Sequence, residues 1–177
     1  MSGYLNCPPA ELVFDHNRYG KPVLLDNTPT NQVEFNISHS AGIALFAFVW
    51  NRRIGVDVEY LRDNFDHLKL AARFFSSHEI AALSSLPNDE IKAGFFRCWT
   101  RKEAFVKAHG EGLSLPLESF DVNLASGEKA CLLATRGELE AADEWTMEDI
   151  PLGPEYAGAL VVHGRGLKLD YFQLVSE

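Results

Sequence analysis

Two acidic side chains, Asp57 and Glu59, lie two positions apart in the segment GVDVE at residues 55–59. Side chains alternate across a strand, so both carboxylates point to one face while the neighbouring valines point to the other. Like charges this close are costly unless a positive charge lies between them. A hard divalent cation meets that need, and oxygen-only ligands favour magnesium or manganese. For this segment alone, the alternative interpretation is an exposed strand face that is merely acidic.

A third carboxylate, Glu103, lies in the helical segment WTRKEAFVK at residues 99–107. Positions three and four apart are neighbours on a helix, so Trp99, Glu103 and Lys107 form one stripe. Because an unpaired buried carboxylate is costly, Glu103 needs a partner within this largely apolar helix. Two interpretations stay open: Lys107 forms a plain ion pair with Glu103, or Glu103 is the third carboxylate of a metal site.

Three further candidates carry weaker signals. Ser38 and His39 lie in NISHS at residues 36–40, which we expect to be a polar turn, and they offer the donors that an anion site needs. Lys21 lies between a glycine and a proline, in a rigid turn that would aim its ammonium group. The chain has no GxSxG, Walker A or HExxH motif, so other common chemistries are poorly supported.

Composition narrows the classes of function further. The 177 residues carry a formal net charge of −9, which argues against general nucleic-acid binding. The three cysteines have neither CxxC spacing nor an even number, so we expect neither a disulfide framework nor a zinc site. No apolar run approaches the roughly 20 residues of a membrane span, and the first residues do not resemble a signal peptide. We expect a cytoplasmic protein without membrane association.

The elements that position these residues form an α+β arrangement. Loop dominates residues 1–32, with short strands around 11–14 and 23–25, and the apolar run at 43–50 predicts a strand buried on both faces. Capping and glycine signals delimit three helices. The expected helices cover 67–75, 76–86 and 89–109. The other expected strands cover 33–38, 53–60, 119–124, 130–135, 145–150, 156–163 and 167–174.

Together, the segments NISHS, GVDVE, the stretch from Phe96 to Lys107 and GEGL at residues 110–113 resemble the 4′-phosphopantetheinyl transferases in order and spacing. The likeness is closest to the large, surfactin-synthetase-activating type. YGKP, RFFS and LSLP, which begin at Tyr19, Arg73 and Leu113, strengthen it. Each motif is weak alone, but the combination is specific, and it covers residues 18–124 well and the C-terminal strands loosely.

The resemblance implies two similar α+β lobes with the active site between them. Asp57, Glu59 and Glu103 match the acidic metal-site positions of the family, and Lys107 matches the lysine near the reacting phosphate. Lys21, Ser38 and His39 match positions that contact coenzyme A phosphates.

Large-type relatives carry several dozen more residues before the YGKP segment, whereas 18 residues precede Tyr19 here. We therefore expect a shortened first lobe at residues 1–62 and a C-terminal lobe at residues 63–177, acting as one functional unit. An incomplete first lobe would weaken nucleotide binding. It would also favour a homodimer in which one copy covers the other's apolar strands.

The implied reaction moves phosphopantetheine from coenzyme A to a serine of an acyl or peptidyl carrier protein and releases 3′,5′-ADP. Glu103 would accept the serine proton, with Glu59 as the alternative base, and Lys107 would steady the phosphate oxygens. Two other functions stay open. One is a relative that binds carrier protein or coenzyme A without turnover, and the other is a magnesium-dependent phosphohydrolase.

Overall fold

The structure is a computed structural model that describes residue 5, residues 7–25 and residues 32–174. It confirms the α+β class. The described residues include the α-helices α2 (His67–Phe74), α3 (Ser77–Ser84) and α4 (Ile91–His109). The strands are β1 (Phe14–His16), β2 (Pro22–Leu24), β3 (Val33–Ser40), β4 (Ile43–Trp50), β5 (Ile54–Tyr60), β6 (Phe120–Val122), β7 (Leu132–Thr135), β8 (Trp145–Asp149) and β9 (Tyr156–His163).

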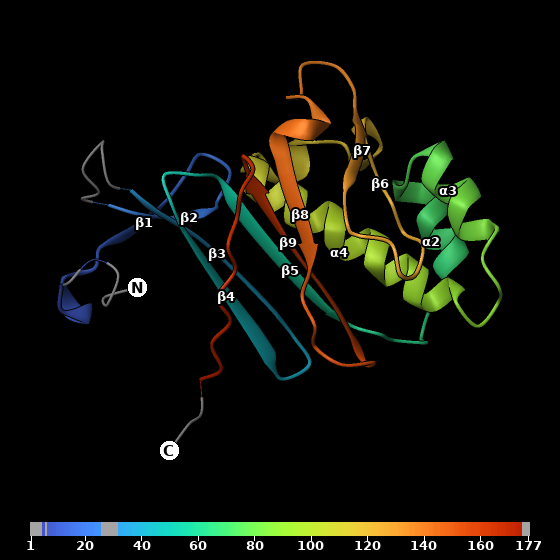
Figure 1. Cartoon of the computed structure of the whole chain (residues 1–177), viewed down its shortest axis with the longest axis horizontal. Coiled ribbons are helices and arrows are strands. Elements are labelled where there is room, and N and C mark those ends of the chain that lie inside the picture. The colour runs from blue at the N-terminus through green and yellow to red at the C-terminus, as the bar shows by residue number, and fades with distance from the viewer. Residues whose placement is uncertain (1–4, 6, 26–31, 175–177) are drawn as a thin grey trace.

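The body of the fold consists of a three-stranded antiparallel sheet, ordered β5-β9-β8, and an antiparallel hairpin, β3-β4, beside it. The long helix α4 lies across one face of the three-stranded sheet, and α2 and α3 pack at one end of the molecule (Figure 1). The hairpins β1-β2 and β6-β7 form two smaller sheets. No helix in the described ranges is both long and apolar enough to cross a bilayer.

Close packing of α4 on β5 depends on Gly55. A Cβ atom at this position would lie 2.0 Å from the Ala104 carbonyl oxygen and 2.3 Å from the Ala108 amide nitrogen. Both atoms belong to the helix backbone and cannot move aside, so only glycine allows the helix this close to the strand. Gly55 therefore sets the distance between the carboxylates of β5 and the side chains of α4.

The helix ends follow the expected signals. Ser76 caps α3, accepting a hydrogen bond from the Glu79 amide, while the Glu79 carboxylate accepts one from the Ser76 amide. This is the expected capping box. Helix α4 ends at Gly110, whose φ of +85° is in the left-handed region that favours glycine. The side chain of Asn17 donates to the Gly110 carbonyl and so ties the turn before β2 to this helix end.

Two apolar cores lie on opposite sides of the three-stranded sheet. The larger one joins α2, α3 and α4 to β6, β8 and β9, with Phe95, Phe105 and Phe120 almost fully buried. The smaller one lies between the other face of the sheet and β4 and includes Val56 and Leu160. Burial of side chains of this size contributes about 1.5–3 kcal/mol each, so the larger core dominates the stability of the fold.

Three expectations about strands were wrong in different ways. Residues 167–174 form no strand, because Leu167 and Leu169 pack onto the smaller core instead of pairing along a strand edge, and Phe172 is 82% exposed. Residues 9–11 form a 3₁₀ turn, so the first strand starts at Phe14 instead of residue 11. The strand at 43–50 is not buried on both faces: Leu45, Ala47 and Val49 pack on the smaller core, whereas Phe46 is 52% exposed.

Candidate active site

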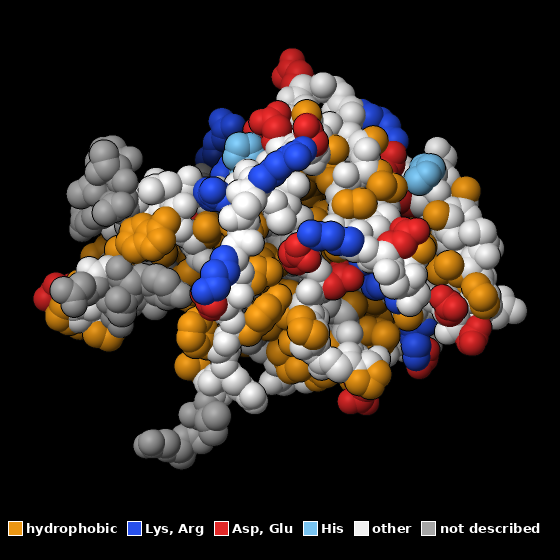
Figure 2. Space-filling view, viewed as in Figure 1, with side chains coloured by type: hydrophobic (Ala, Val, Ile, Leu, Met, Phe, Trp, Pro, Cys, Tyr) orange, Lys and Arg blue, Asp and Glu red, His pale blue; other side chains and the backbone are white. Residues whose placement is uncertain are grey.

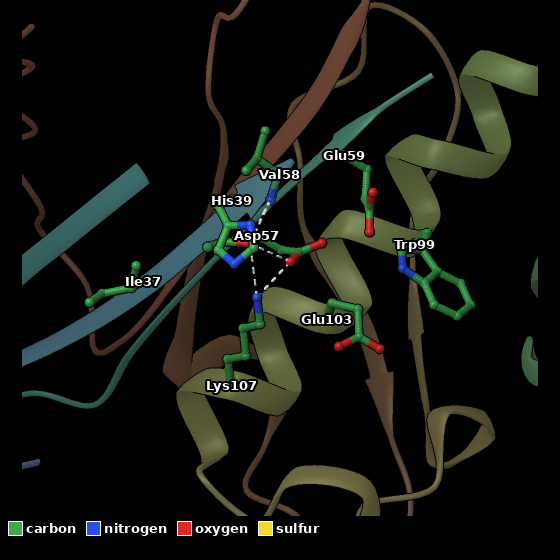
Figure 3. Close-up of a pocket in the computed structure, with 9 residues that line it drawn as sticks. Ile37, His39, Asp57, Val58, Glu59, Trp99, Glu103 and Lys107 are labelled. Atoms are coloured by element: carbon green, nitrogen blue, oxygen red, sulfur yellow. Dashed lines mark hydrogen bonds and ion pairs between the residues drawn. The ribbon is translucent and has the colours of Figure 1, made fainter. Parts of the chain in front are cut away.

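A cavity of about 380 Å³ opens between β3, β5 and α4. Its walls bring together most of the residues singled out in the sequence, and Figure 3 shows how their side chains are arranged around it. The lining residues are Ile37, Ser38, His39, Asp57, Val58, Glu59, Trp99, Glu103 and Lys107. The strand pair Asp57 and Glu59 and the expected helical stripe therefore face one space.

Strand alternation and helical spacing account for this convergence. Asp57 and Glu59 share one face of β5, and that face looks toward α4. Trp99, Glu103 and Lys107 are four residues apart on α4 and present their side chains to the cavity one turn after another. The close approach that Gly55 allows brings both sets into range of each other.

The ammonium group of Lys107 is the main positive charge at the cavity. Its Nζ lies 2.6 Å from Asp57 Oδ1, 3.0 Å from Ser38 Oγ and 3.2 Å from the Val56 carbonyl oxygen (Figure 3). In the described residues, no ion pair within 4 Å joins Lys107 to Glu103. The interpretation of Lys107 as the simple ion-pair partner of Glu103 was therefore wrong, because the lysine crosses to the strand instead.

Asp57 is the most buried carboxylate of the cavity, with 5% of the residue exposed. Oδ1 binds Lys107 and Ser38, whereas Oδ2 is buried and, among the described residues, has no hydrogen-bond partner. Burial raises the pKa of Asp57 and the charge of Glu59 adds to this, while Lys107 acts in the opposite direction. An unpartnered buried carboxylate oxygen is costly, which makes Oδ2 a candidate ligand atom.

Glu103 is electrostatically coupled to both strand carboxylates. Burial raises the pKa of Glu103 most, the charges of Asp57 and Glu59 raise it further, and Lys107 lowers it. Glu59 Oε2 accepts a hydrogen bond from Ser40 and lies 3.6 Å from a guanidinium nitrogen of Arg62. The cavity thus holds three coupled carboxylates facing a single lysine, an excess of negative charge that a cation would offset.

The donor set fits a hard divalent cation in its chemistry, since it offers only carboxylate oxygens and includes the unpartnered Asp57 Oδ2. The described residues nevertheless contain no group of three Asp, Glu, His or Cys side chains close enough together to hold a metal ion. Lys107 already occupies Asp57 Oδ1, and the like charges of the carboxylates disfavour close approach without a cation. Ligation by Asp57, Glu59 and Glu103 therefore requires the three carboxylates to lie closer together, and it stays a prediction.

The predicted coenzyme A contacts fall in two places. Ser38 and His39 line the cavity, but they lie in β3, which continues to Ser40, so the expected polar turn at 36–40 was wrong. The chain reverses instead at Ala41 and Gly42, whose φ angles are +42° and +89°. A strand here is favoured by the full pairing of β3 with β4.

Lys21 does not line the cavity. Its Nζ donates to the Ile54 carbonyl at 2.9 Å, and burial lowers its pKa. The rigid turn expected around it is present, because Asn17 Oδ1 accepts from the Lys21 amide and Gly20 has a φ of +86°. Contact of Lys21 with a ligand phosphate stays a prediction.

Sequence reasoning missed two polar residues of β3 that bind β5. Asn36 Oδ1 accepts from the Val56 amide, and Ser40 Oγ accepts from the Tyr60 amide. The alternating polar pattern at 36, 38 and 40 was a signal for this contact, but it was interpreted as a turn. Lys102, also part of the helical motif, points away from the cavity and forms a fully buried ion pair with Glu79.

Comparison with known proteins came to one family. A family model described as the 4′-phosphopantetheinyl transferase superfamily matches residues 53–161. A 4′-phosphopantetheinyl transferase, HetI of Nostoc sp., is 37% identical over 166 residues, which cover 94% of this chain and 67% of the relative. The 4′-phosphopantetheinyl transferase Sfp of Bacillus subtilis is 39% identical over 115 residues, which cover 65% of this chain and 49% of the relative. The chain thus spans about half to two thirds of these relatives.

Solved structures support the fold. A holo-(acyl-carrier-protein) synthase from Bacillus anthracis, in complex with CoA (3′,5′-ADP), aligns with a TM-score of 0.50 at 23% identity, covering 62% of this chain and 93% of the other. The holo-[acyl-carrier-protein] synthase of Thermotoga maritima gives the same TM-score and identity, covering 64% and 63%.

Proposed function

We propose that this chain, which belongs to the 4′-phosphopantetheinyl transferase superfamily, transfers 4′-phosphopantetheine from coenzyme A to a serine of an acyl or peptidyl carrier protein and releases 3′,5′-ADP. The observation that carries the proposal is the cavity in which Asp57, Glu59 and Glu103 face Lys107. Phosphoryl transfer requires little covalent chemistry from a protein, and its main demands are positioning and charge compensation. A cavity with oxygen ligands on two elements and one lysine is suited to both.

The three carboxylates would hold a magnesium ion, for which manganese could substitute. Such an ion would supply positive charge that offsets the negative charge growing on the leaving phosphate. The buried Asp57, with Oδ2 free of hydrogen bonds within the described residues, would be the fixed ligand. Glu59 and Glu103 would complete the site.

In the proposed reaction the serine oxygen of the carrier forms a bond to the β-phosphorus of coenzyme A. The bond between that phosphorus and the bridging oxygen breaks, and 3′,5′-ADP leaves with the electron pair. Glu103 accepts the serine proton, with Glu59 as the alternative base. Lys107 donates to the phosphate oxygens and steadies their charge.

Lys21 and His39 would hold nucleotide phosphates, and His39 is exposed on the rim of the cavity. The role of Ser38 in phosphate binding is less direct, because its hydroxyl already contacts Asp57, Lys107 and the Val58 amide. All three assignments are proposals that rest on the family resemblance as well as on position.

Two lobes would build this site, with residues 1–62 forming the shorter one and residues 63–177 the other. Strand β5 would be shared, because it belongs to the first segment but pairs with β9.

A homodimer would cover Phe46 and Trp50 on the outer face of the β3-β4 hairpin, which are 52% and 39% exposed. Static light scattering would test the dimer, and a monomer at high concentration would exclude it. The free cysteines favour the cytoplasm as the compartment.

The test of the proposed function is mass spectrometry of apo carrier proteins incubated with the chain, coenzyme A and magnesium. The expected result is a phosphopantetheine adduct on the carrier serine. Omission of magnesium, with a chelator added, should abolish it. An unmodified carrier under all conditions, with an established transferase modifying the same sample, would contradict the proposal.

A further inference from the structure

Strands β3 and β5 lie next to each other without forming a backbone ladder. Within the described residues they belong to different sheets, because β3 pairs with β4 and β5 pairs with β9. The edge of β5 that faces β3 nevertheless carries amide groups that need acceptors, since unpaired buried amides are rare and costly.

Side chains of β3 supply these acceptors at every second residue. Asn36 Oδ1 accepts from the Val56 amide at 2.9 Å, and Ser38 Oγ accepts from the Val58 amide at 3.2 Å. Ser40 Oγ accepts from the Tyr60 amide at 3.1 Å. The residue numbers rise together along both strands, so the strands run parallel and are joined by side chains instead of by backbone carbonyls.

Each serine has a second contact, with the carboxylate one residue before its amide. Ser38 Oγ donates to Asp57 Oδ1 at 2.9 Å, and Ser40 Oγ donates to Glu59 Oε2 at 3.1 Å. A hydroxyl has one proton and two lone pairs. Because the amide of β5 fixes the position of the oxygen, the single proton is aimed at the carboxylate.

As a consequence, a serine hydroxyl binds one oxygen of each strand carboxylate, and the second oxygen is available to a ligand. Ser38 and Lys107 bind Asp57 Oδ1, whereas Oδ2 has no partner in the described part of the chain. Ser40 binds Glu59 Oε2, and Arg62 Nη2 lies 3.6 Å from the same oxygen. The same arrangement thus occurs twice along β5, once for each carboxylate.

Ser38 has no remaining hydrogen-bond capacity. Its proton goes to Asp57, and its lone pairs accept from the Val58 amide and the Lys107 ammonium group. The residue is also only 7% exposed. These contacts favour a role on the carboxylate over direct binding of a phosphate.

We propose that Ser38 and Ser40 are positioning residues, each of which holds one oxygen of a β5 carboxylate so that the second oxygen is presented to the divalent cation. This inference rests on the proposed function, because it assumes a cation at Asp57 and Glu59. Hydrogen bonds to metal ligands orient them and raise their affinity, and loss of such a bond typically weakens metal binding about 10–100-fold.

Asn36 provides a matched control within the row of β3 acceptors formed by Asn36, Ser38 and Ser40. It accepts a β5 amide as the serines do, but the residue before that amide is Gly55, which has no carboxylate. Asn36→Ala therefore removes a contact between the strands and leaves the carboxylates untouched. A purely structural role for the row predicts equal effects of Asn36→Ala and Ser40→Ala, whereas positioning predicts different ones.

The test is titration of the full chain with Mn²⁺, followed by electron paramagnetic resonance of the free ion, together with thermal melting of each variant. Ser40→Ala should weaken Mn²⁺ binding about 10-fold, Asn36→Ala should change it less than about 2-fold, and both should lower Tm. Ser40→Thr, which keeps the hydroxyl, should bind Mn²⁺ nearly as wild type does. Ser40→Val, which matches the shape of Ser40→Thr but lacks the hydroxyl, should bind as weakly as Ser40→Ala, and the valine–threonine pair carries the test if the alanine variant does not fold.

Unchanged Mn²⁺ affinity in Ser40→Val, or an equal loss in Asn36→Ala and Ser40→Ala, would overturn the inference while leaving the metal site in place. A wild-type chain that binds no Mn²⁺ would overturn the metal site, and the inference with it. The wild-type titration thus separates the two failures.

Discussion

Two of the lysines on helix α4, Lys102 and Lys107, lie in opposite electrostatic surroundings. Lys102 and Glu79 form an ion pair in which neither side chain is exposed, and the Phe120 carbonyl and the Val122 amide complete their hydrogen bonds. Five residues further along the helix, Lys107 faces three carboxylates, and Asp57 Oδ2 has no partner among the described residues.

The difference separates structure from function. In the first region each charge has its counterpart, so the network is complete without a ligand and ties α3 and β6 to α4. In the second region acidic groups outnumber the basic one, and burial raises the pKa of Asp57 and Glu103. Unbalanced buried charge of this kind is typical of sites that bind a ligand.

The largest expected effect is on the complete hydrogen-bond network around Lys102 and Glu79. Lys102→Met leaves the buried Glu79 carboxylate without its counter-charge and should lower the free energy of unfolding by about 3–5 kcal/mol. Urea denaturation measures the loss. The double variant Lys102→Met with Glu79→Leu removes both charges and should recover much of it. A loss below about 1 kcal/mol in the single variant would show that this pair does not differ from a surface ion pair.

Asp57→Asn should greatly slow the reaction at the cavity around Lys107 while leaving the fold intact. The change keeps the shape of the side chain but removes the negative charge next to Lys107, so turnover should fall by roughly 10²-fold, equivalent to about 2.7 kcal/mol. Rates of carrier modification measure this. Asp63→Asn, at an exposed acid that pairs with Lys92, is the control and should keep the wild-type rate. Equal rates in both variants would remove Asp57 from the mechanism.

Gly55→Ala tests the packing of α4 on β5, which brings the cavity residues together. The new Cβ would meet the α4 backbone, and overpacking of this type costs about 1–3 kcal/mol. Because α4 must shift away from β5, the variant should lose activity even below its melting temperature. Gly158→Ala is the comparison, since its Cβ at 2.7 Å would meet the Leu152 side chain, which can rotate. A Gly158→Ala loss as large as that of Gly55→Ala would contradict the argument.

The smallest expected effect is on the pH dependence of stability. Burial, followed by the charge of Asp57, raises the pKa of Glu103 in the folded chain. Between the unfolded and folded pKa values the folded state binds more protons, so this contribution to stability is complete below the unfolded pKa and is lost as pH rises through the folded one. Glu103→Gln should therefore lose less stability than wild type between mildly acidic and neutral pH. Parallel stability curves measured by urea denaturation would contradict this.

Much of the cavity could be predicted because its signals are local. Strand alternation places Asp57 and Glu59 together, and helical spacing places Trp99, Glu103 and Lys107 together. The convergence of the two sets was expected from the family resemblance. The partner of Lys107 could not be predicted, because the choice between Glu103 and Asp57 depends on how closely α4 approaches β5.

The errors came from contacts between segments that are distant in the sequence. In the sequence, the polar residues at 36, 38 and 40 are typical of a turn. In the structure their side chains accept hydrogen bonds from the amides of β5, which lies beside them. Leu167 and Leu169 show strand-like alternation, but they pack against the smaller apolar core and do not pair with a strand edge. In both cases the local pattern was real, and the neighbouring element decided its structure.

The most direct measurement for the whole account is 3′,5′-ADP release from coenzyme A by the full chain in magnesium, with and without an apo carrier protein. The account predicts release only when the carrier is present, in amounts that match the modified carrier, and its loss in Asp57→Asn. Release without carrier would instead indicate hydrolysis. An absence of release with carriers that an established transferase modifies, from a chain that is folded by circular dichroism, would contradict the account.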